Sequence, residues 1–176
     1  MKNIIVFGGS TSKASINKQL VTYTASLLSK TAYKVLDLND FEAPLYSIDQ
    51  EVAFGFSEGV EASNNEFAKA DGFIVSLAEH NGSYAVGFKN LLDWLSRKEQ
   101  KLFRDKPVLV LATSPGKRGG ASVLNLATNV FPYLGANVTG SFSLPSFNEN
   151  FKEGKIQDTD LVSKLKVLVE AFEKEL

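Results

Sequence analysis

The chain has 176 residues, which is long enough for one domain with a substantial hydrophobic core. Its net charge of -1 excludes a broad basic surface for nucleic acid. Neither a signal-type segment nor an apolar run of the ~20 residues that span a bilayer is present in the sequence. We therefore expect a cytoplasmic protein that binds no membrane. The absence of cysteine excludes disulfides, thiolate metal ligands and a cysteine nucleophile, and the single histidine, His80, argues against a histidine-rich metal site.

Apolar runs alternate with amphipathic stretches along the whole chain. The third and fourth apolar runs are continuous, which is typical of strands buried on both faces of a parallel sheet. The second run contains Lys34 and Asp37, which favours an edge position. Strands are predicted at residues 3–8, 33–38, 72–77, 107–113 and 137–140.

Helical spacing of apolar residues fills the intervals between the strands. Helices are predicted directly after a capping Ser15, at residues 58–69, 88–95 and 120–133, and from residue 159 or 160 onward. This alternation predicts βαβ units with right-handed crossovers. The expected fold class is α/β, a flavodoxin-like three-layer sandwich with a five-stranded parallel sheet in the order 2-1-3-4-5 and helices on both faces. We expect residues 1–176 to form a single domain, with long loops at 42–59 and 143–157.

The segment between the first strand and the first helix, residues 8–17, is rich in glycine and hydroxyl groups. Such groups at a helix N-terminus favour an anion, and we expect a phosphate. The adjacent Gly8 and Gly9 match neither the G-x-G-x-x-G loop of dinucleotide sites nor the G-x-x-x-x-G-K-[ST] loop of nucleotide triphosphate sites. A hydroxyl-lined loop for a monophosphate is the remaining phosphate hypothesis. The alternative is that Ser15 only caps the helix and the other residues form a polar turn.

Two further loops are rich in glycine and small polar residues, at 78–84 and 113–120, directly after the third and fourth strands. Ligands of open parallel sheets bind at the carboxyl ends of the strands. The three loops should therefore converge on one crevice, where glycine lets the backbone approach a flat ligand closely.

These loops resemble the motifs of the NADPH-dependent FMN reductase family, flavodoxin-like oxidoreductases that include chromate, quinone and azo-dye reductases. The first family motif is G-S-x-R-x-x-S-x-N, in which this chain has Ser12 in place of the arginine, followed by Lys13. The second motif, P-E-Y-N-G-S-x-P-G-x-L-K-N-x-x-D-W, is the longest, and Ala78, His80, Ala85 and Val86 depart from it. The residues that match the first motif are Gly9, Ser10, Ser15 and Asn17. Those that match the second are Glu79, Asn81, Gly82, Ser83, Lys89, Asn90, Asp93 and Trp94. The third motif, S-P-G-x-x-G-G, is matched by Ser114, Pro115, Gly116, Gly119 and Gly120.

The resemblance implies FMN as the cofactor and NAD(P)H as the co-substrate. Hydride would pass from the nicotinamide to flavin N5, and electrons would then pass to a quinone, azo compound, chromate or free flavin in a ping-pong mechanism. Because the flavin carries the chemistry, no catalytic side chain is expected. The residues implied to bind FMN are Gly9, Ser10, Ser12, Lys13, Ser15, Ile16, Asn17, Glu79, His80, Asn81, Gly82, Ser114, Gly116 and Gly119.

The resemblance also implies a homodimer or a dimer of dimers. Trp94 lies off the main apolar stripe of its predicted helix, so we expect a partner surface to cover it. The other expected partner is a small-molecule electron acceptor.

Two other functions stay open at this point. A flavodoxin-type electron carrier would bind FMN without turning over NAD(P)H, although such carriers are usually acidic and this chain has a net charge of only -1. A hydrolase could use Ser83 or Ser114 with His80, but the G-x-S-x-G nucleophile elbow is missing.

Overall fold

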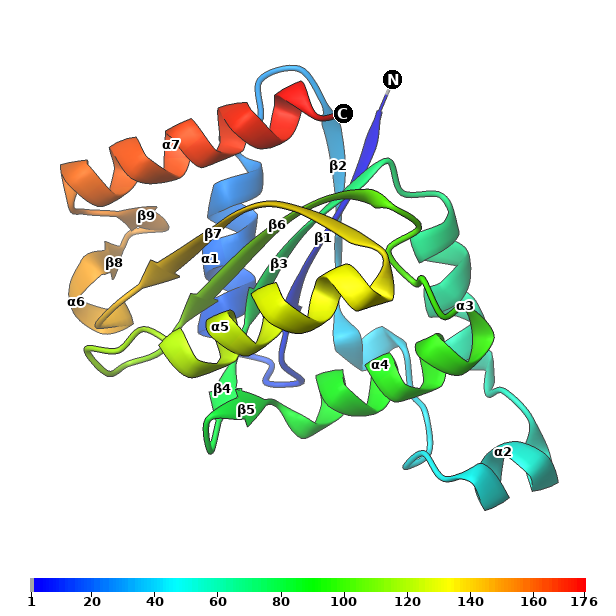
Figure 1. The fold of residues 1–176 in the computed structure, drawn as a ribbon. Helices are drawn as coiled ribbons and strands as arrows, with labels where there is room; N and C mark the ends of the chain where they lie inside the picture. The colour runs from blue at the N-terminus through cyan, green and yellow to red at the C-terminus, as the bar shows by residue number, and fades with distance from the viewer. Residues whose placement is uncertain (1) are drawn as a thin grey trace.

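Five parallel strands form the central sheet of the computed structural model, which describes residues 2–176 (Figure 1). In spatial order they are β2 (Ala32–Leu36), β1 (Asn3–Gly9), β3 (Gly72–Leu77), β6 (Lys106–Thr113) and β7 (Ala136–Leu144). This is the order 2-1-3-4-5 expected from the sequence, and it confirms the flavodoxin-like α/β fold. The polar second strand lies at an edge, as its composition predicts.

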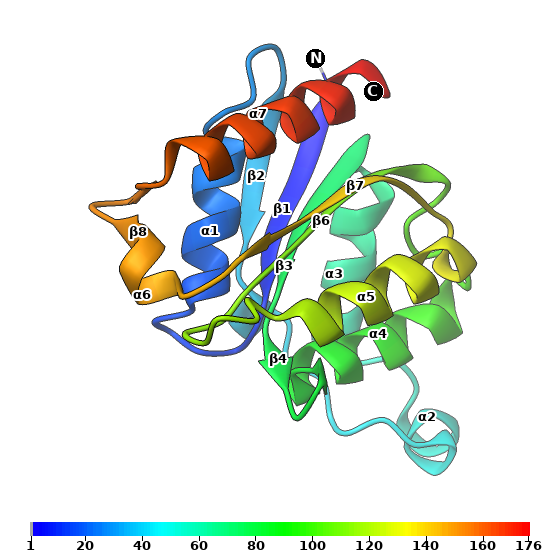
Figure 2. The ribbon, with the colours of Figure 1, turned by 60° about the vertical axis from the view of Figure 1, so that its left-hand side comes forward.

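Helices cover both faces of the sheet and form the two outer layers (Figures 1 and 2). One face carries α1 (Ile16–Ala25) and α7 (Thr159–Lys174). The other face carries α3 (Glu58–Ala68), α4 (Val86–Lys98) and α5 (Ala121–Val130). None of the helices within residues 2–176 is long and apolar enough to cross a bilayer.

The alternation of side chains along the strands divides the core into two clusters. In β1, Ile5 and Phe7 pack with the cluster under α3, α4 and α5, whereas Ile4 and Val6 pack with the cluster under α1 and α7. All four side chains are at most 1% exposed. A strand buried on both faces has no polar positions, which explains why the central strands read as continuous apolar runs.

The segment expected to be a loop at 42–59 contains a helix. After η1 (Leu38–Asp40) the chain extends away from the body of the protein and forms α2 (Ile48–Phe54) before it returns (Figure 1). Ser47 caps α2 by accepting a hydrogen bond from the Gln50 backbone N–H at 3.1 Å. The helix buries none of its side chains in the protein, so it carries no apolar periodicity to reveal it in the sequence. We call residues 43–56 the arm.

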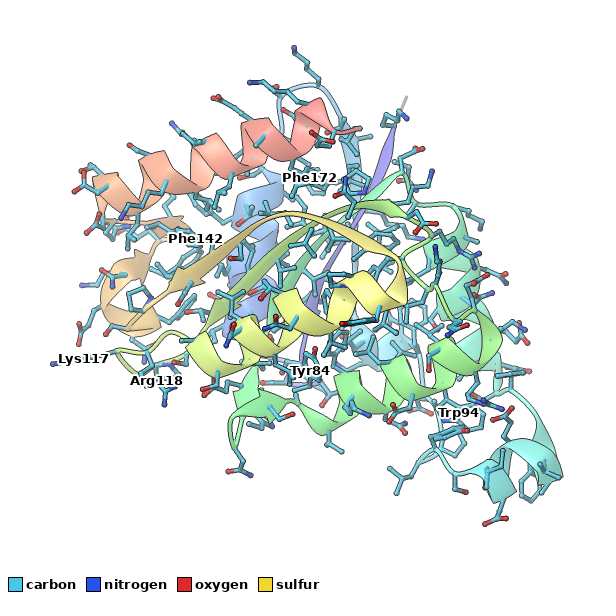
Figure 3. The ribbon with its side chains drawn as sticks, in the orientation of Figure 1. Tyr84, Trp94, Lys117, Arg118, Phe142 and Phe172 are labelled. Atoms are coloured by element: carbon cyan, nitrogen blue, oxygen red, sulfur yellow. The ribbon has the colours of Figure 1, made fainter. Side chains whose placement is uncertain are left out.

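The arm also buries Trp94, and the expectation that a partner molecule covers this side chain was wrong. Trp94 is 0% exposed, and its indole N–H donates to the carbonyl of Pro44 at 2.8 Å (Figure 3). Tyr46 and Phe56 pack their edges against the indole ring, with centroids at 5.1 and 5.9 Å. The arm itself therefore explains the aromatic residue off the main stripe of α4.

The second expected loop, at 143–157, is also more ordered than the sequence predicts. It contains α6 (Phe147–Asn150) and a hairpin of β8 (Phe151–Lys152) and β9 (Lys155–Ile156). Its phenylalanines serve the core, since Phe147 and Phe151 are buried and stacked with centroids 4.8 Å apart.

Glu173, near the end of α7, ties that helix to the loop before β2. Its carboxylate accepts hydrogen bonds from the backbone N–H groups of Ser29 and Lys30 at 3.0 Å and from the Thr31 hydroxyl at 3.1 Å. Burial opposes ionisation, but the hydrogen bonds from Lys30, Ser29 and Thr31 outweigh it and hold the pKa of the Glu173 carboxyl below its ordinary value of 4.5.

We expect Glu173→Gln to lower the free energy of unfolding by about 1 kcal/mol at pH 7, because the replacement weakens charge-assisted hydrogen bonds. A carboxyl with a lowered folded-state pKa stabilises the protein above the unfolded value and loses that contribution as the pH falls. The difference between wild type and variant should therefore be complete above pH 4.5 and shrink below it. Urea unfolding of both proteins across this range measures it, and a constant difference would refute the assignment.

Candidate functional site

The loops after β1, β3 and β6 meet at the carboxyl edge of the sheet, as the topology requires. They enclose a cavity of about 250 Å³, which we call the loop cavity. The residues that line it are Ser10, Ser12, Ala14, Ser15, Ile16, Asn17, Ala78, Glu79, His80, Thr113, Ser114 and Pro115.

The loop after β1 places hydroxyl groups at the N-terminus of α1. The helix begins against the end of the strand, so closely that a Cβ on Gly8 would lie 2.7 Å from the Lys18 backbone nitrogen. Ser15 caps the helix by accepting from the Lys18 N–H at 3.1 Å, and the Ser12 N–H donates to the Ser10 hydroxyl at 3.2 Å. Ser15 is thus a cap that also lines the cavity, so the two interpretations of this serine are compatible.

The electrostatic character of this end of the cavity suits an anion. Ile16 and Asn17 occupy the first positions of α1, where backbone N–H groups have no acceptor within the helix. The first turn of α1 contains no acidic residue. The positive end of the helix dipole therefore faces the loop without a neutralising charge of its own.

The side chain of Asn17 links this loop to two neighbouring strands. It is 2% exposed. Its Oδ1 accepts hydrogen bonds from the Ser76 hydroxyl at 2.7 Å and from the Thr113 N–H at 3.1 Å, and its Nδ2 donates to the Thr113 carbonyl at 3.2 Å. Most of the hydrogen-bonding capacity of this amide is thereby used within the protein, so Asn17 ties the start of α1 to the ends of β3 and β6.

The loop after β3 is a small hairpin of β4 (Glu79–His80) and β5 (Ser83–Tyr84). Asn81 and Gly82 form its turn with φ of 51° and 77°, the conformation of a type I′ connection, which Asn-Gly favours. Tyr84 is buried between α4 and α5 (Figure 3), and burial raises the pKa of its phenol to about 12, so that it is neutral at physiological pH.

The loop after β6, residues 114–120, is attached to the end of β7 and the segment that follows. The Gly116 carbonyl accepts from the Ser146 N–H at 3.0 Å, and the Gly119 carbonyl accepts from the Ser143 hydroxyl at 2.9 Å. Lys117 and Arg118 extend from this loop toward the outside of the molecule (Figure 3). The loop contributes Ser114 and Pro115 to the lining of the cavity, whereas the expected binding residues Gly116 and Gly119 are not among its lining residues.

The structure brings many of the expected binding residues together and places the others around them. Gly9 lies buried at the end of β1, and Asn81 and Gly82 form the hairpin turn. Lys13 lines the two cavities that flank the loop, of about 720 and 510 Å³. The residues that line the loop cavity are Ser10, Ser12, Ser15, Ile16, Asn17, Glu79, His80 and Ser114.

Sequence reasoning missed Ser76 and Thr113, the partners of Asn17. Each is a fully or almost fully buried hydroxyl residue at the end of an otherwise apolar strand. Such a residue must find a hydrogen-bond partner, so its position in the run is a signal that could have been used.

Comparison with known proteins places these loops in a described family. Residues 2–149 match the model of the family NADPH-dependent FMN reductase. A quinone reductase of Escherichia coli is 32% identical over 139 residues, which cover 77% of this chain and 72% of that protein. An NADPH azoreductase of a Bacillus species is 27% identical over 174 residues, 98% of this chain and 89% of that protein. The solved structure of FerB, a flavoenzyme NAD(P)H:(acceptor) oxidoreductase from Paracoccus denitrificans, has a TM-score of 0.76 at 25% identity and covers 99% of both chains.

We expect Asn17→Ala to lower the free energy of unfolding by about 3 kcal/mol, because it leaves buried groups of Ser76 and Thr113 without partners. In a Ser76→Ala background the same change should cost about 1 kcal/mol less, since one of those groups is already gone. Thr24→Ala is the matched control: Thr24 is buried in the same helix but bonds only the Leu20 carbonyl. Urea denaturation measures all four variants, and additive losses for Asn17 and Ser76 would contradict the network.

Proposed function

We propose that this chain, which belongs to the NADPH-dependent FMN reductase family, binds FMN in the loop cavity and uses NAD(P)H to reduce a small-molecule acceptor. Family membership confirms the resemblance found in the motifs, and with it the class of enzyme and FMN as the cofactor. When bound, FMN supplies the redox chemistry by accepting a hydride from the nicotinamide and passing electrons to the acceptor.

The hydroxyl-lined N-terminus of α1 is the observation that carries the proposal. Ser10, Ser12 and Ser15 supply hydroxyl groups, and Ile16 supplies a backbone N–H, at a helix end without an acidic residue. These donors fit a terminal phosphate. In this proposal Asn17 positions the loop and leaves the phosphate to its neighbours, because its side chain is bonded to Ser76 and Thr113.

The other end of the cavity suits a flat ring. The β4–β5 hairpin contributes Glu79 and His80 to its lining, and the loop 114–120 contributes Ser114 and Pro115. His80 is exposed at the rim of the cavity, where an acceptor could contact it. The names of the relatives favour a quinone or an azo compound as the acceptor. Reduction of chromate or free flavin and the ping-pong order of the reaction stay predictions. The same holds for the single-domain organisation and the cytoplasmic location.

The rival functions are weaker on this geometry. Within residues 2–176, His80 makes no hydrogen bond to Ser83 or Ser114, and the Ser114 hydroxyl donates to the Gly116 carbonyl at 3.4 Å. A serine hydrolase needs its nucleophile within reach of a base. The electron carrier would use the same cavity, so turnover of NAD(P)H decides between it and the reductase.

We propose a homodimer on the evidence of the arm. Its side chains Leu45, Val52 and Phe54 are 76%, 80% and 76% exposed, and Ile48 of the same segment is also exposed. A cluster of large apolar side chains in water is unfavourable and marks an interaction surface. Since these apolar side chains of the arm are not covered by its own chain, a second copy is the proposed cover.

We expect purified protein to bind FMN at least about tenfold more tightly than riboflavin, a difference of about 1.4 kcal/mol, because only FMN carries the phosphate. Ser12→Arg restores the arginine of the family motif and should tighten FMN further, since a guanidinium binds phosphate through two hydrogen bonds, while riboflavin affinity stays unchanged. Fluorescence titration with both flavins measures this. Equal affinities in the wild type would refute the phosphate site.

The same samples test the enzymatic proposal. The FMN-loaded protein should oxidise NADPH in the presence of benzoquinone, followed by absorbance. A yellow protein without NADPH oxidation would indicate an electron carrier, and a colourless protein with esterase activity would indicate a hydrolase.

We expect the wild type to run as a dimer in light scattering at micromolar concentration and Val52→Asp to run as a monomer, because a charge in an apolar interface is unpaired and desolvated. Val167→Asp is the matched control: Val167 is 64% exposed on α7, away from the arm, and its replacement should leave the dimer intact. A monomeric wild type would eliminate this interface.

A further inference from the structure

The N-terminus of α5 is capped by a residue from a distant part of the chain. Its own N-cap residue is Gly120, which has no side chain, and its first turn contains no acidic residue. Instead, Oε2 of Glu79 accepts hydrogen bonds from the backbone N–H groups of Ser122 at 2.9 Å and Val123 at 3.0 Å. By contrast, α1, α3 and α7 are each capped by the side chain directly before them in the sequence.

This contact fixes the β4–β5 hairpin, which has little structure of its own. Each of its strands is two residues long, Glu79 with His80 and Ser83 with Tyr84. Isolated hairpins of this size are not stable in water. Glu79 therefore anchors the hairpin to α5 through its carboxylate, while Tyr84 anchors the other strand by packing against Phe88 and Phe131.

The carboxylate also changes the charge around the loop cavity. Glu79 is the one acidic side chain among its described lining residues, and it lies at the positive end of the α5 dipole. Without it, that helix end would face the cavity as a second site favourable to negative charge. With it, the partial positive charge of the helix end is offset, and the carboxylate leaves a net negative charge there.

We infer that Glu79 is a positioning residue that fixes the hairpin to α5 and whose charge disfavours the reduced, anionic form of the bound flavin relative to the oxidised form. The inference rests on the proposed FMN site. Glu79 is assigned no bond to the cofactor, since the contacts of its carboxylate are with Ser122 and Val123.

The charge is tested by Glu79→Gln, which retains a carbonyl oxygen to accept from α5 but removes the charge. In FMN-loaded protein this variant should bind reduced flavin about tenfold more tightly relative to oxidised flavin, which raises the two-electron potential by about 30 mV. Glu170→Gln is the matched control, because Glu170 is exposed on α7 and should cause no shift. An unchanged potential in Glu79→Gln would overturn the charge assignment.

The anchor is tested without cofactor by hydrogen exchange of the Ser122 and Val123 amides in the unloaded protein. Glu79→Ala should accelerate their exchange at least about tenfold, whereas Glu79→Gln should largely retain protection. Unchanged exchange in Glu79→Ala would overturn the anchor. Absence of FMN binding in the wild type would overturn the proposed function and the charge assignment together, and the exchange experiment would still decide the anchor.

Discussion

The buried amide of Asn17 is the contact on which the arrangement of the site depends. Parallel strands end side by side, but nothing in the sheet hydrogen bonding fixes how the loops beyond them continue. Asn17 stands at the start of α1 and bonds both the Ser76 hydroxyl of β3 and the backbone of Thr113 at the end of β6. Thr113 in turn donates its hydroxyl to the Leu144 carbonyl of β7 at 2.7 Å. These contacts connect the start of α1 with the carboxyl ends of β3, β6 and β7.

Such a network is favourable only when it is complete. A buried amide or hydroxyl without a partner destabilises the fold by more than a typical hydrogen bond stabilises it. Removing one side chain of the network therefore destabilises the protein through the partners that remain unbonded. The apolar strands form a rigid base, and the polar network at their ends fixes how the loops continue beyond them. The loops can therefore hold hydroxyl and amide groups around a cavity while making few contacts with each other.

Much of the fold could be predicted because it depends on local patterns. The continuous apolar runs gave β3 and β6 closely, and Ser15 with the spacing of Leu20 located α1. The arm could not be predicted in this way, because α2 has no buried face and Trp94 is covered by Pro44, 50 positions away in the sequence.

The convergence of the three loops could be predicted from the strand order, but the contacts of the individual residues could not. The motifs drew attention to Asn17 and Glu79 as groups near a ligand. The structure shows that Asn17 Oδ1 and Glu79 Oε2 accept hydrogen bonds from partners 96 and 43 positions away in the sequence. Spacing along the chain contains no information on which of two nearby polar groups faces the ligand and which holds the loop.

The N-termini of α1 and α5, which lie near the loop cavity, differ in charge. The N-terminus of α1 has hydroxyl groups and no carboxylate, so it favours a phosphate. The N-terminus of α5 is neutralised by Glu79, so it does not compete for the same anion. In the proposed FMN site, the phosphate would therefore lie at α1 and the ring beside the hairpin and α5. One carboxylate from another loop therefore makes the N-termini of α1 and α5 differ in charge.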